Sequence, residues 1–183
     1  MKKFIRDIEK YKQYSNGKSA IVLFLTTQGL WALFVYRLAN TIYLSSLPTI
    51  FKKILLLGAV IHQKIIEITT GISIPYAATI GERFYIAHHG HIIIHPNVCI
   101  GDNCNIAQGV TIGISGRGKR RGVPIIGNNV FIAANAVIAG KITIGNNSVI
   151  GANSLVVSNV DNDITVVGVP AIQVSNNNSE AYI

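Results

Sequence analysis

Residues 144–155 read Ile-Gly-Asn-Asn-Ser-Val-Ile-Gly-Ala-Asn-Ser-Leu, which is one six-residue unit written twice. Each unit holds an aliphatic residue, a small residue, two turn-forming residues, a small or β-branched residue and a variable one. The same unit occupies residues 100–105, Ile-Gly-Asp-Asn-Cys-Asn. Gly and Asn adopt left-handed backbone conformations at low cost, so the chain can turn a corner after each short strand.

The period of six extends well beyond these units, because aliphatic residues mark it through most of the chain: Ile80, Ile86, Ile94, Ile100, Ile106, Ile112, Ile126, Ile132, Ile138, Ile144, Ile150 and Val156. A unit of six residues cannot bury its own aliphatic side chain. Stacked coils can, if each strand pairs with the equivalent strand one coil away at about 4.8 Å and the first and fifth positions point inward. The sequence therefore predicts a mainly β fold, a parallel β-helix.

Two departures from the period indicate where the coils are interrupted. Ile86 and Ile94 are eight residues apart, just around a His-rich stretch, and Ile112 and Ile126 are fourteen apart. The second gap predicts a protruding loop over residues 114–125. Insertions in solenoids often form the binding face.

Before Gly71 the period is helical instead. Leu30, Leu33 and Leu38 recur at helical spacing, Pro48 suits a first helical turn, and Gly71 suits a helix end. We expect a helical segment over residues 1–70, a β-helix over 71–171 and a C-terminal tail over 172–183.

Composition narrows the class of protein. The 183 residues are 49% hydrophobic and 13% charged, which argues against disorder, a coiled coil or two large domains. The formal charge of +8 favours anionic partners, but no nucleic-acid recognition motif accompanies it.

No apolar run reaches the roughly 20 residues of a spanning helix, so peripheral membrane contact of the basic, apolar helices and their mutual burial both stay open. Two cysteines and the absence of a secretory signal predict a cytoplasmic protein without disulfides.

The repeat resembles that of the hexapeptide-repeat acyltransferases, and further motifs are similar to the serine acetyltransferase-like branch of that family. These motifs are residues 28–33 with Tyr36-Arg37-Leu38, the segment 109–113 (Gly-Val-Thr-Ile-Gly) before the loop, and the closing turn 168–171 (Gly-Val-Pro-Ala). The resemblance implies a left-handed β-helix that assembles as a homotrimer, with acetyl-coenzyme A as the acyl donor.

The resemblance also places the family's catalytic histidine on His88, with His89 as the local alternative. Both lie outside the inward slots of their repeat, which are Ile86 and Gly90, so they are free to face a groove. An imidazole with a pKa near 6.5 can take a proton from an alcohol at neutral pH. We expect no metal site, because His91 and His95 are four residues apart but no later coil carries a histidine.

Coenzyme A binding is expected at cations and small residues. Arg117, Lys119, Arg120 and Arg121 place positive charge on the loop, where phosphates could bind, although a solvated loop tip would look the same. By resemblance, the pantetheine arm runs along small residues, here Gly113, Ala133, Ala134 and Ala152. Cys104 takes an inward slot and is expected to be core packing rather than a nucleophile.

The acceptor is harder to predict, because residues of serine acetyltransferases are missing. An Asp directly before the catalytic histidine and another about fifteen residues upstream correspond to Ala87 and Ser73, and a loop histidine corresponds to Val123. Their absence removes groups that would orient the imidazole or recognise serine. We therefore expect an O-acetyltransferase acting on a hydroxyl of a sugar or cell-surface polysaccharide precursor. The alternatives are a serine O-acetyltransferase of cysteine biosynthesis and a non-catalytic β-helix scaffold.

Overall fold

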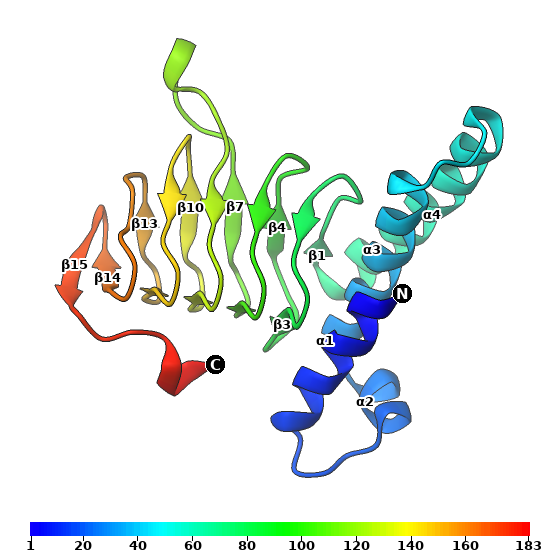
Figure 1. Ribbon diagram of the computed structural model, residues 1–183, viewed down its shortest axis with the longest axis horizontal. Helices are drawn as coiled ribbons and strands as arrows, with labels where there is room; N and C mark the ends of the chain where they lie inside the picture. Colours follow the sequence, from blue (N-terminus) through cyan, green and yellow to red (C-terminus); the bar gives the residue numbers. More distant parts are fainter.

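The computed structural model describes residues 1–183, with helices at one end and a solenoid of short strands at the other (Figure 1). The α-helices are α1 (Lys2–Gln13), α2 (Ala20–Thr26), α3 (Gln28–Leu44) and α4 (Thr49–Thr70). The strands are β1 (Ile72–Ser73), β2 (Thr79–Ile80), β3 (Tyr85–Ile86), β4 (Ile92–Ile94), β5 (Cys99–Ile100), β6 (Asn105–Ile106), β7 (Thr111–Gly113), β8 (Ile125–Ile126), β9 (Phe131–Ile132), β10 (Val137–Ala139), β11 (Thr143–Ile144), β12 (Val149–Ile150), β13 (Leu155–Val156), β14 (Thr165–Gly168) and β15 (Ala171–Ser175). Two 3₁₀ helices, η1 (Gly118–Arg120) and η2 (Glu180–Tyr182), complete the structure.

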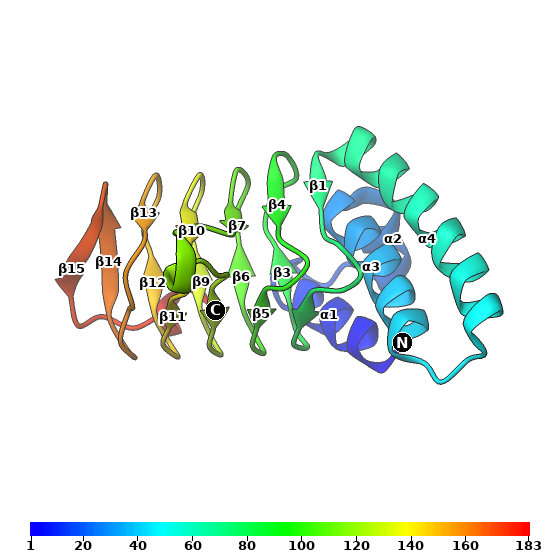
Figure 2. The ribbon, with the colours of Figure 1, turned by 90° about the horizontal axis from the view of Figure 1, so that it is seen from above.

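The solenoid is a left-handed parallel β-helix, which confirms the predicted fold. Its three sheets run in the orders β1-β4-β7-β10-β13, β11-β8-β5-β2 and β15-β14-β12-β9-β6-β3. Consecutive strands lie in different sheets, and each pairs in parallel with the strand one coil away; Ile94, for example, pairs with Ile112. The one antiparallel pair is β14 with β15, where the last strand folds back on the coil before it (Figure 2).

The interior of the solenoid is a column of aliphatic side chains. Ile86, Ile106, Ile132 and Ile150 stack in one sheet and are 0–1% exposed. A corner between two of the sheets is built by asparagines in the left-handed region, with φ of 58° at Asn103 and 54° at Asn129. Their amides also hydrogen-bond along the stack, Asn103 Nδ2 to Asn129 Oδ1 at 2.8 Å. The turn-forming positions of the repeat therefore bond one coil to the next.

The helices cover the first coil. Helix α4 ends at Thr70, and Gly71 takes a left-handed conformation with φ of 68°. Its carbonyl then accepts a hydrogen bond from Ile92 N at 2.9 Å, so the chain passes directly from helix into solenoid. Helix α4 packs on α3, at the end farthest from β15 (Figure 2). No helix taken singly has the length and apolarity to span a membrane; only α2 and α3 together, bent by 98°, meet that criterion.

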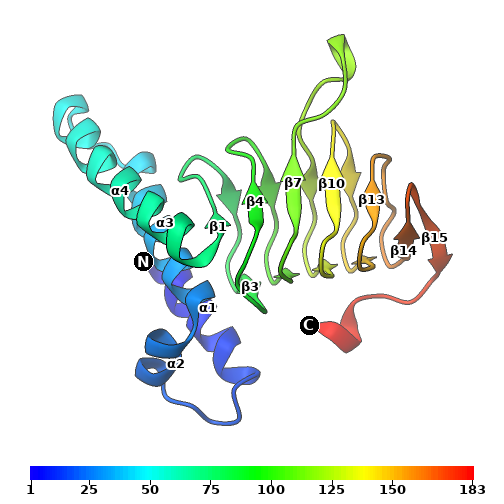
Figure 3. The same ribbon diagram turned by 180° about the vertical axis from the view of Figure 1, so that it is seen from behind.

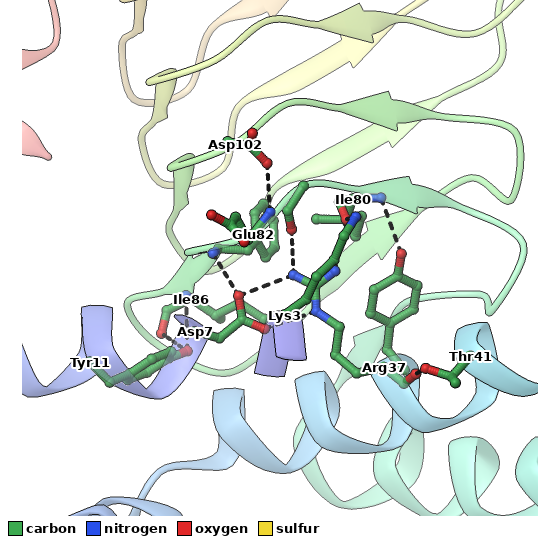
Figure 4. A network of polar contacts seen from close by, with 12 residues as sticks. Lys3, Asp7, Tyr11, Arg37, Thr41, Ile80, Glu82, Ile86 and Asp102 are labelled. Carbon is green, nitrogen blue, oxygen red and sulfur yellow. Dashed lines mark hydrogen bonds and ion pairs between the residues drawn. The ribbon is translucent and has the colours of Figure 1, made fainter. Parts of the chain in front are cut away.

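A buried ion pair joins the helices to the solenoid (Figure 4). Arg37 Nε donates to Asp7 Oδ2 at 2.8 Å, and both side chains are nearly inaccessible, at 3% and 0%. Arg37 Nη1 also donates to the carbonyl of Ile80 at 2.8 Å, and Asp7 accepts from Phe84 N at 2.9 Å. Burial raises the pKa of the Asp7 carboxyl, opposed by its bonds to Arg37. The pair thus satisfies backbone groups of the first coil that no earlier coil can reach.

The C-terminal tail returns along the solenoid instead of leaving it (Figures 1 and 3). Tyr182 stacks on Phe131 with ring centroids 4.8 Å apart, and its carbonyl accepts from Asn105 Nδ2 at 2.8 Å.

We predict that Asp7→Ala lowers the free energy of unfolding by about 3–5 kcal/mol, because it leaves the Arg37 charge buried without its partner. Glu9→Ala on the same helix removes only the solvent-exposed ion pair with Arg6 and should cost about 0–1 kcal/mol. Urea denaturation followed by circular dichroism measures both. Equal losses in the two variants would contradict the anchoring role of Asp7.

Candidate active site

His88 and His89 lie on the corner that connects β3 to β4, and both are exposed. This corner stacks on those that follow β6, β9 and β12: Gly109 N donates to the carbonyl of Gly90 at 2.9 Å, and Asn135 N donates to the carbonyl of Gln108 at 2.9 Å. The corner with the histidines is longer than its neighbours. It therefore bulges outward from the first coil.

The local sequence accounts for the bulge. Gly90 has a φ of 111° and His91 a φ of 52°, so two successive residues take left-handed conformations. In addition, Gly71 packs so closely here that a Cβ added to it would lie 2.9 Å from His91 N. The end of α4 thus supports the corner from behind while His88 and His89 face solvent.

All four predicted small residues are partly or fully exposed, and three of them share an edge with the histidines. Ala133 and Ala134 lie on the corner after β9, and Ala152 lies on the corner after β12. Gly113 lies apart from them, at the far end of β7, where it pairs with Ala139. The structure therefore aligns His88, His89 and the three alanines along one edge of the prism and places Gly113 across a sheet from them.

A cavity of about 280 Å³ opens between the histidine corner and the first three helices. Besides His88 and His89, its lining includes the ammonium-bearing Lys18. It also includes polar side chains at the end of α1 and around the junction of α2 and α3, namely Tyr14, Ser15, Thr26, Thr27 and Gln28. The cavity combines an exposed imidazole with one cation and several hydroxyl groups, which suits a small polar acceptor with a negative charge.

The wall of this cavity is held rigidly. Tyr11 Oη donates to the carbonyl of Ile86 and accepts from Ile86 N, both at 3.0 Å. Burial raises the pKa of the Tyr11 phenol well above its usual value, so it remains a neutral donor. Gly29 lets α3 approach it, since a Cβ there would lie 2.6 Å from Tyr11 Oη.

No carboxylate orients the imidazole of His88. The histidines whose rings hydrogen-bond within the chain are His62 and His95, at Gly58 O and Asn97 N, and the residue before His88 is Ala87. His91, one of the partners considered from the sequence, is exposed at the end of the same corner. A carboxylate does accept a hydrogen bond beside the end of α4, where Ser73 Oγ donates to Glu67 Oε1 at 2.7 Å, but neither residue lines the cavity with His88.

Two of the four predicted phosphate-binding cations line a common groove. A groove of about 390 Å³ under the protruding loop is lined by Lys119 and Arg120 from η1 and by Lys141 from the next coil. Arg117 and Arg121 are exposed but lie outside this groove. Gly122 allows the loop to close on Lys141, since a Cβ there would lie 2.7 Å from the Lys141 Cβ.

Sequence reasoning missed Lys141 and Lys18. The signal available in the sequence was Gly140, directly before Lys141, because a glycine suits a corner. In the structure Gly140 has a φ of 111° at a corner on the coil beside the loop. Lys18 lies between two helices and gave no signal in the repeat pattern.

The cysteines are not placed for catalysis. Cys104 is buried with its thiol 3.2 Å from the carbonyl of Gly127, and burial raises the pKa of that thiol to about 11. Cys99 is exposed on β5, which lies between β2 and β8 in a different sheet from β3. No group of three or more His, Cys, Asp or Glu side chains is arranged to hold a metal ion.

Comparisons with known proteins point to one group. The family model "Bacterial transferase hexapeptide (six repeats)" matches residues 124–158. A serine acetyltransferase of Bacillus pumilus is 36% identical over 160 residues, which cover 87% of this chain and 70% of the relative. The crystal structure of serine acetyltransferase from Neisseria gonorrhoeae superposes with a TM-score of 0.81 at 34% identity over 95% of this chain, and the chain spans 64% of that protein.

Two further solved structures contain ligands. The gonococcal enzyme has also been solved in complex with serine, with a TM-score of 0.79 and 34% identity over 95% of this chain and 68% of that one. Serine acetyltransferase from Brucella abortus has been solved in complex with coenzyme A, with a TM-score of 0.80 and 28% identity over 95% of this chain and 67% of that one.

These similarities show that the predicted sugar or polysaccharide acceptor was wrong, since the relatives are named serine acetyltransferases. The prediction relied on the missing acidic residues at positions 73 and 87. It could not take into account groups that the fold brings in from other segments, such as the Lys18 ammonium in the histidine cavity.

We predict that Gly29→Ala lowers the free energy of unfolding by about 1–3 kcal/mol, because the new methyl group must displace the Tyr11 hydroxyl from its bonds to Ile86. Gly58→Ala is the matched control, since a Cβ at that helical glycine meets nothing within 4 Å; it should raise stability by about 0.5–1 kcal/mol. Thermal unfolding measures both changes. If both variants gained stability, the close approach at Gly29 would be refuted.

Proposed function

We propose that this chain, which belongs to the serine acetyltransferase family of hexapeptide-repeat transferases, transfers the acetyl group of acetyl-coenzyme A to the hydroxyl of L-serine. The observation that carries the proposal is the 36% identity to a serine acetyltransferase over 87% of this chain. The complexes of related structures with serine and with coenzyme A support both substrates.

His88 is the proposed general base. Its exposed imidazole lies on the edge that also carries Ala133, Ala134 and Ala152. As the serine oxygen attacks the thioester carbonyl, the imidazole takes the hydroxyl proton, a contribution of about 10²–10⁴ to the rate. When the tetrahedral intermediate collapses, the bond from carbon to sulfur breaks and the proton passes to the leaving thiolate, giving O-acetylserine and coenzyme A.

The oxyanion of that intermediate needs hydrogen-bond donors. The corner offers them, because the backbone N–H groups of His89 and Gly90 have no acceptor in the backbone network of the chain. On the later coils Gly109 N and Asn135 N donate to the corner one coil before them, and the first coil has no such earlier corner. The donors that catalysis requires are therefore free here.

Lys18 is the proposed partner of the serine carboxylate. It lines the same cavity as His88, and no acidic side chain lies in that lining to neutralise it. This assignment replaces the recognition groups whose absence from the aligned positions misled the sequence analysis.

The groove under the loop is the proposed phosphate site of acetyl-coenzyme A. Lys119, Arg120 and Lys141 converge there, and phosphates are bound by such clusters of cations. The expected homotrimer and a cytoplasmic location remain predictions.

The proposed function is tested by incubating the purified chain with acetyl-coenzyme A and L-serine, with free thiol and O-acetylserine measured together. L-alanine, which lacks the hydroxyl, is the control acceptor. We expect thiol release that depends on serine. Binding of coenzyme A with no acceptor turnover would favour the scaffold alternative.

We predict that His88→Ala lowers kcat at least a hundredfold with an unchanged circular dichroism spectrum, because the base is lost while the corner remains exposed. His89→Ala, the adjacent exposed imidazole, is the matched control and should retain most activity. The reverse order of losses would move the catalytic role to His89.

We predict that replacing Lys119 and Arg120 together by Ala raises the KM for acetyl-coenzyme A about tenfold and leaves the KM for serine unchanged, because two cations leave the groove. The same double replacement at Arg117 and Arg121 removes equal charge outside the groove and should have a smaller effect. Steady-state kinetics with each substrate varied in turn distinguishes the two. Equal effects would show that only the overall charge of the loop matters.

A further inference from the structure

Helix α4 exposes an apolar stripe along its whole length. Its members recur every three or four residues and so share one face of the helix. They are Ile50, Ile54, Leu57, Ile61, Ile65 and Ile68, with exposed fractions between 52% and 84%. The helix packs on α3 but leaves this face without any partner in the chain.

The apolar surface extends to the other helices. On α2, Ile21 and Leu25 are 73% and 67% exposed. They border a groove of about 430 Å³ between α1, α2 and α3 whose lining is entirely apolar. All of these residues belong to the helical end of the molecule, away from β15 (Figures 1 and 2). An apolar surface this extensive usually marks an interaction site.

The helical end carries a net positive charge. Residues 1–70 contain ten Lys and Arg but three Asp and Glu. Each acidic side chain is already paired: Asp7 with Arg37 at 2.8 Å, Glu9 with Arg6 at 3.0 Å and Glu67 with Lys64 at 2.5 Å. Several exposed lysines outside the proposed substrate cavity have no carboxylate partner; they are Lys2, Lys12 and Lys53.

We propose that the helical end binds the surface of an anionic lipid bilayer, with α4 lying in the interface. An amphipathic helix buries its apolar face at the boundary of headgroups and acyl chains, while nearby lysines attract anionic headgroups. The 22 residues of α4 give a contact about 33 Å long. A second copy of the chain would instead bring the same unneutralised lysines together, so the charge favours a lipid surface.

The inference does not depend on the proposed acetyl transfer. The membrane would contact the apolar face of α4, and no residue of α4 lines the His88 cavity or the loop groove.

The test is flotation of the purified chain with vesicles of neutral phosphatidylcholine or of phosphatidylcholine with about a third phosphatidylglycerol. We expect co-flotation with the anionic vesicles, weakening as salt is raised, and little with the neutral ones. Ile61→Gln with Ile65→Gln should lower the bound fraction at least fivefold. The matched control, Ile172→Gln with Val174→Gln, removes two equally exposed aliphatic residues at β15 and should leave binding unchanged.

Circular dichroism confirms that each variant folds, because all four positions are exposed. Failure to float with anionic vesicles would overturn the proposal, as would equal loss in both double variants. Sedimentation without lipid tests the alternative that a second copy of the chain covers this face. If the chain did not float with vesicles and formed an assembly that the Ile61→Gln and Ile65→Gln variant dissociates, the face would be assigned to contacts between copies.

Discussion

The structure depends on the fact that a six-residue unit cannot form the interstrand hydrogen bonds of its own strand or bury its own aliphatic side chain. The strands of a coil pair with the strands one coil away, and the inward aliphatic side chains stack in the same way, as Ile106 does between Ile86 and Ile132. The corners serve the same requirement, because Asn103, Asn129 and Asn147 take left-handed conformations and hydrogen-bond in a ladder. Stacking fixes the spacing of the corners, and the corners carry the candidate site.

The first coil lacks a neighbour on one side, and the helices take that place. Arg37, Tyr11 and Tyr36 reach its carbonyl groups at Ile80, Ile86 and Ala78. The side chains that close the solenoid also shape the cavity beside His88, since Tyr11 forms part of its wall. The same helices therefore cap the first coil and form the cavity beside His88. The exposed apolar face of α4 lies on the side of these helices that faces away from the solenoid.

The sequence predicted what the period controls and missed what packing between distant segments controls. The six-residue repeat was sufficient for the parallel β-helix and for the exposure of His88 and His89. The inward slot predicted at Gly90 was wrong, because the longer corner leaves Gly90 partly exposed and buries Ile92 in that slot. The position of Lys18 depends on how two helices meet the first coil, and that of Lys141 depends on how the loop folds over the next coil. Neither contact has a periodic signal. The acceptor was wrongly predicted because the prediction used residues missing from aligned positions, and such positions carry no information on groups that the fold brings in from other segments.

A crystal structure of the chain with coenzyme A and L-serine bound tests most directly whether His88 and the loop groove form one active site. We expect the serine hydroxyl within hydrogen-bond reach of the His88 ring and the coenzyme phosphates against Lys119, Arg120 and Lys141. Serine bound away from His88, or phosphates held elsewhere on the solenoid, would contradict this expectation.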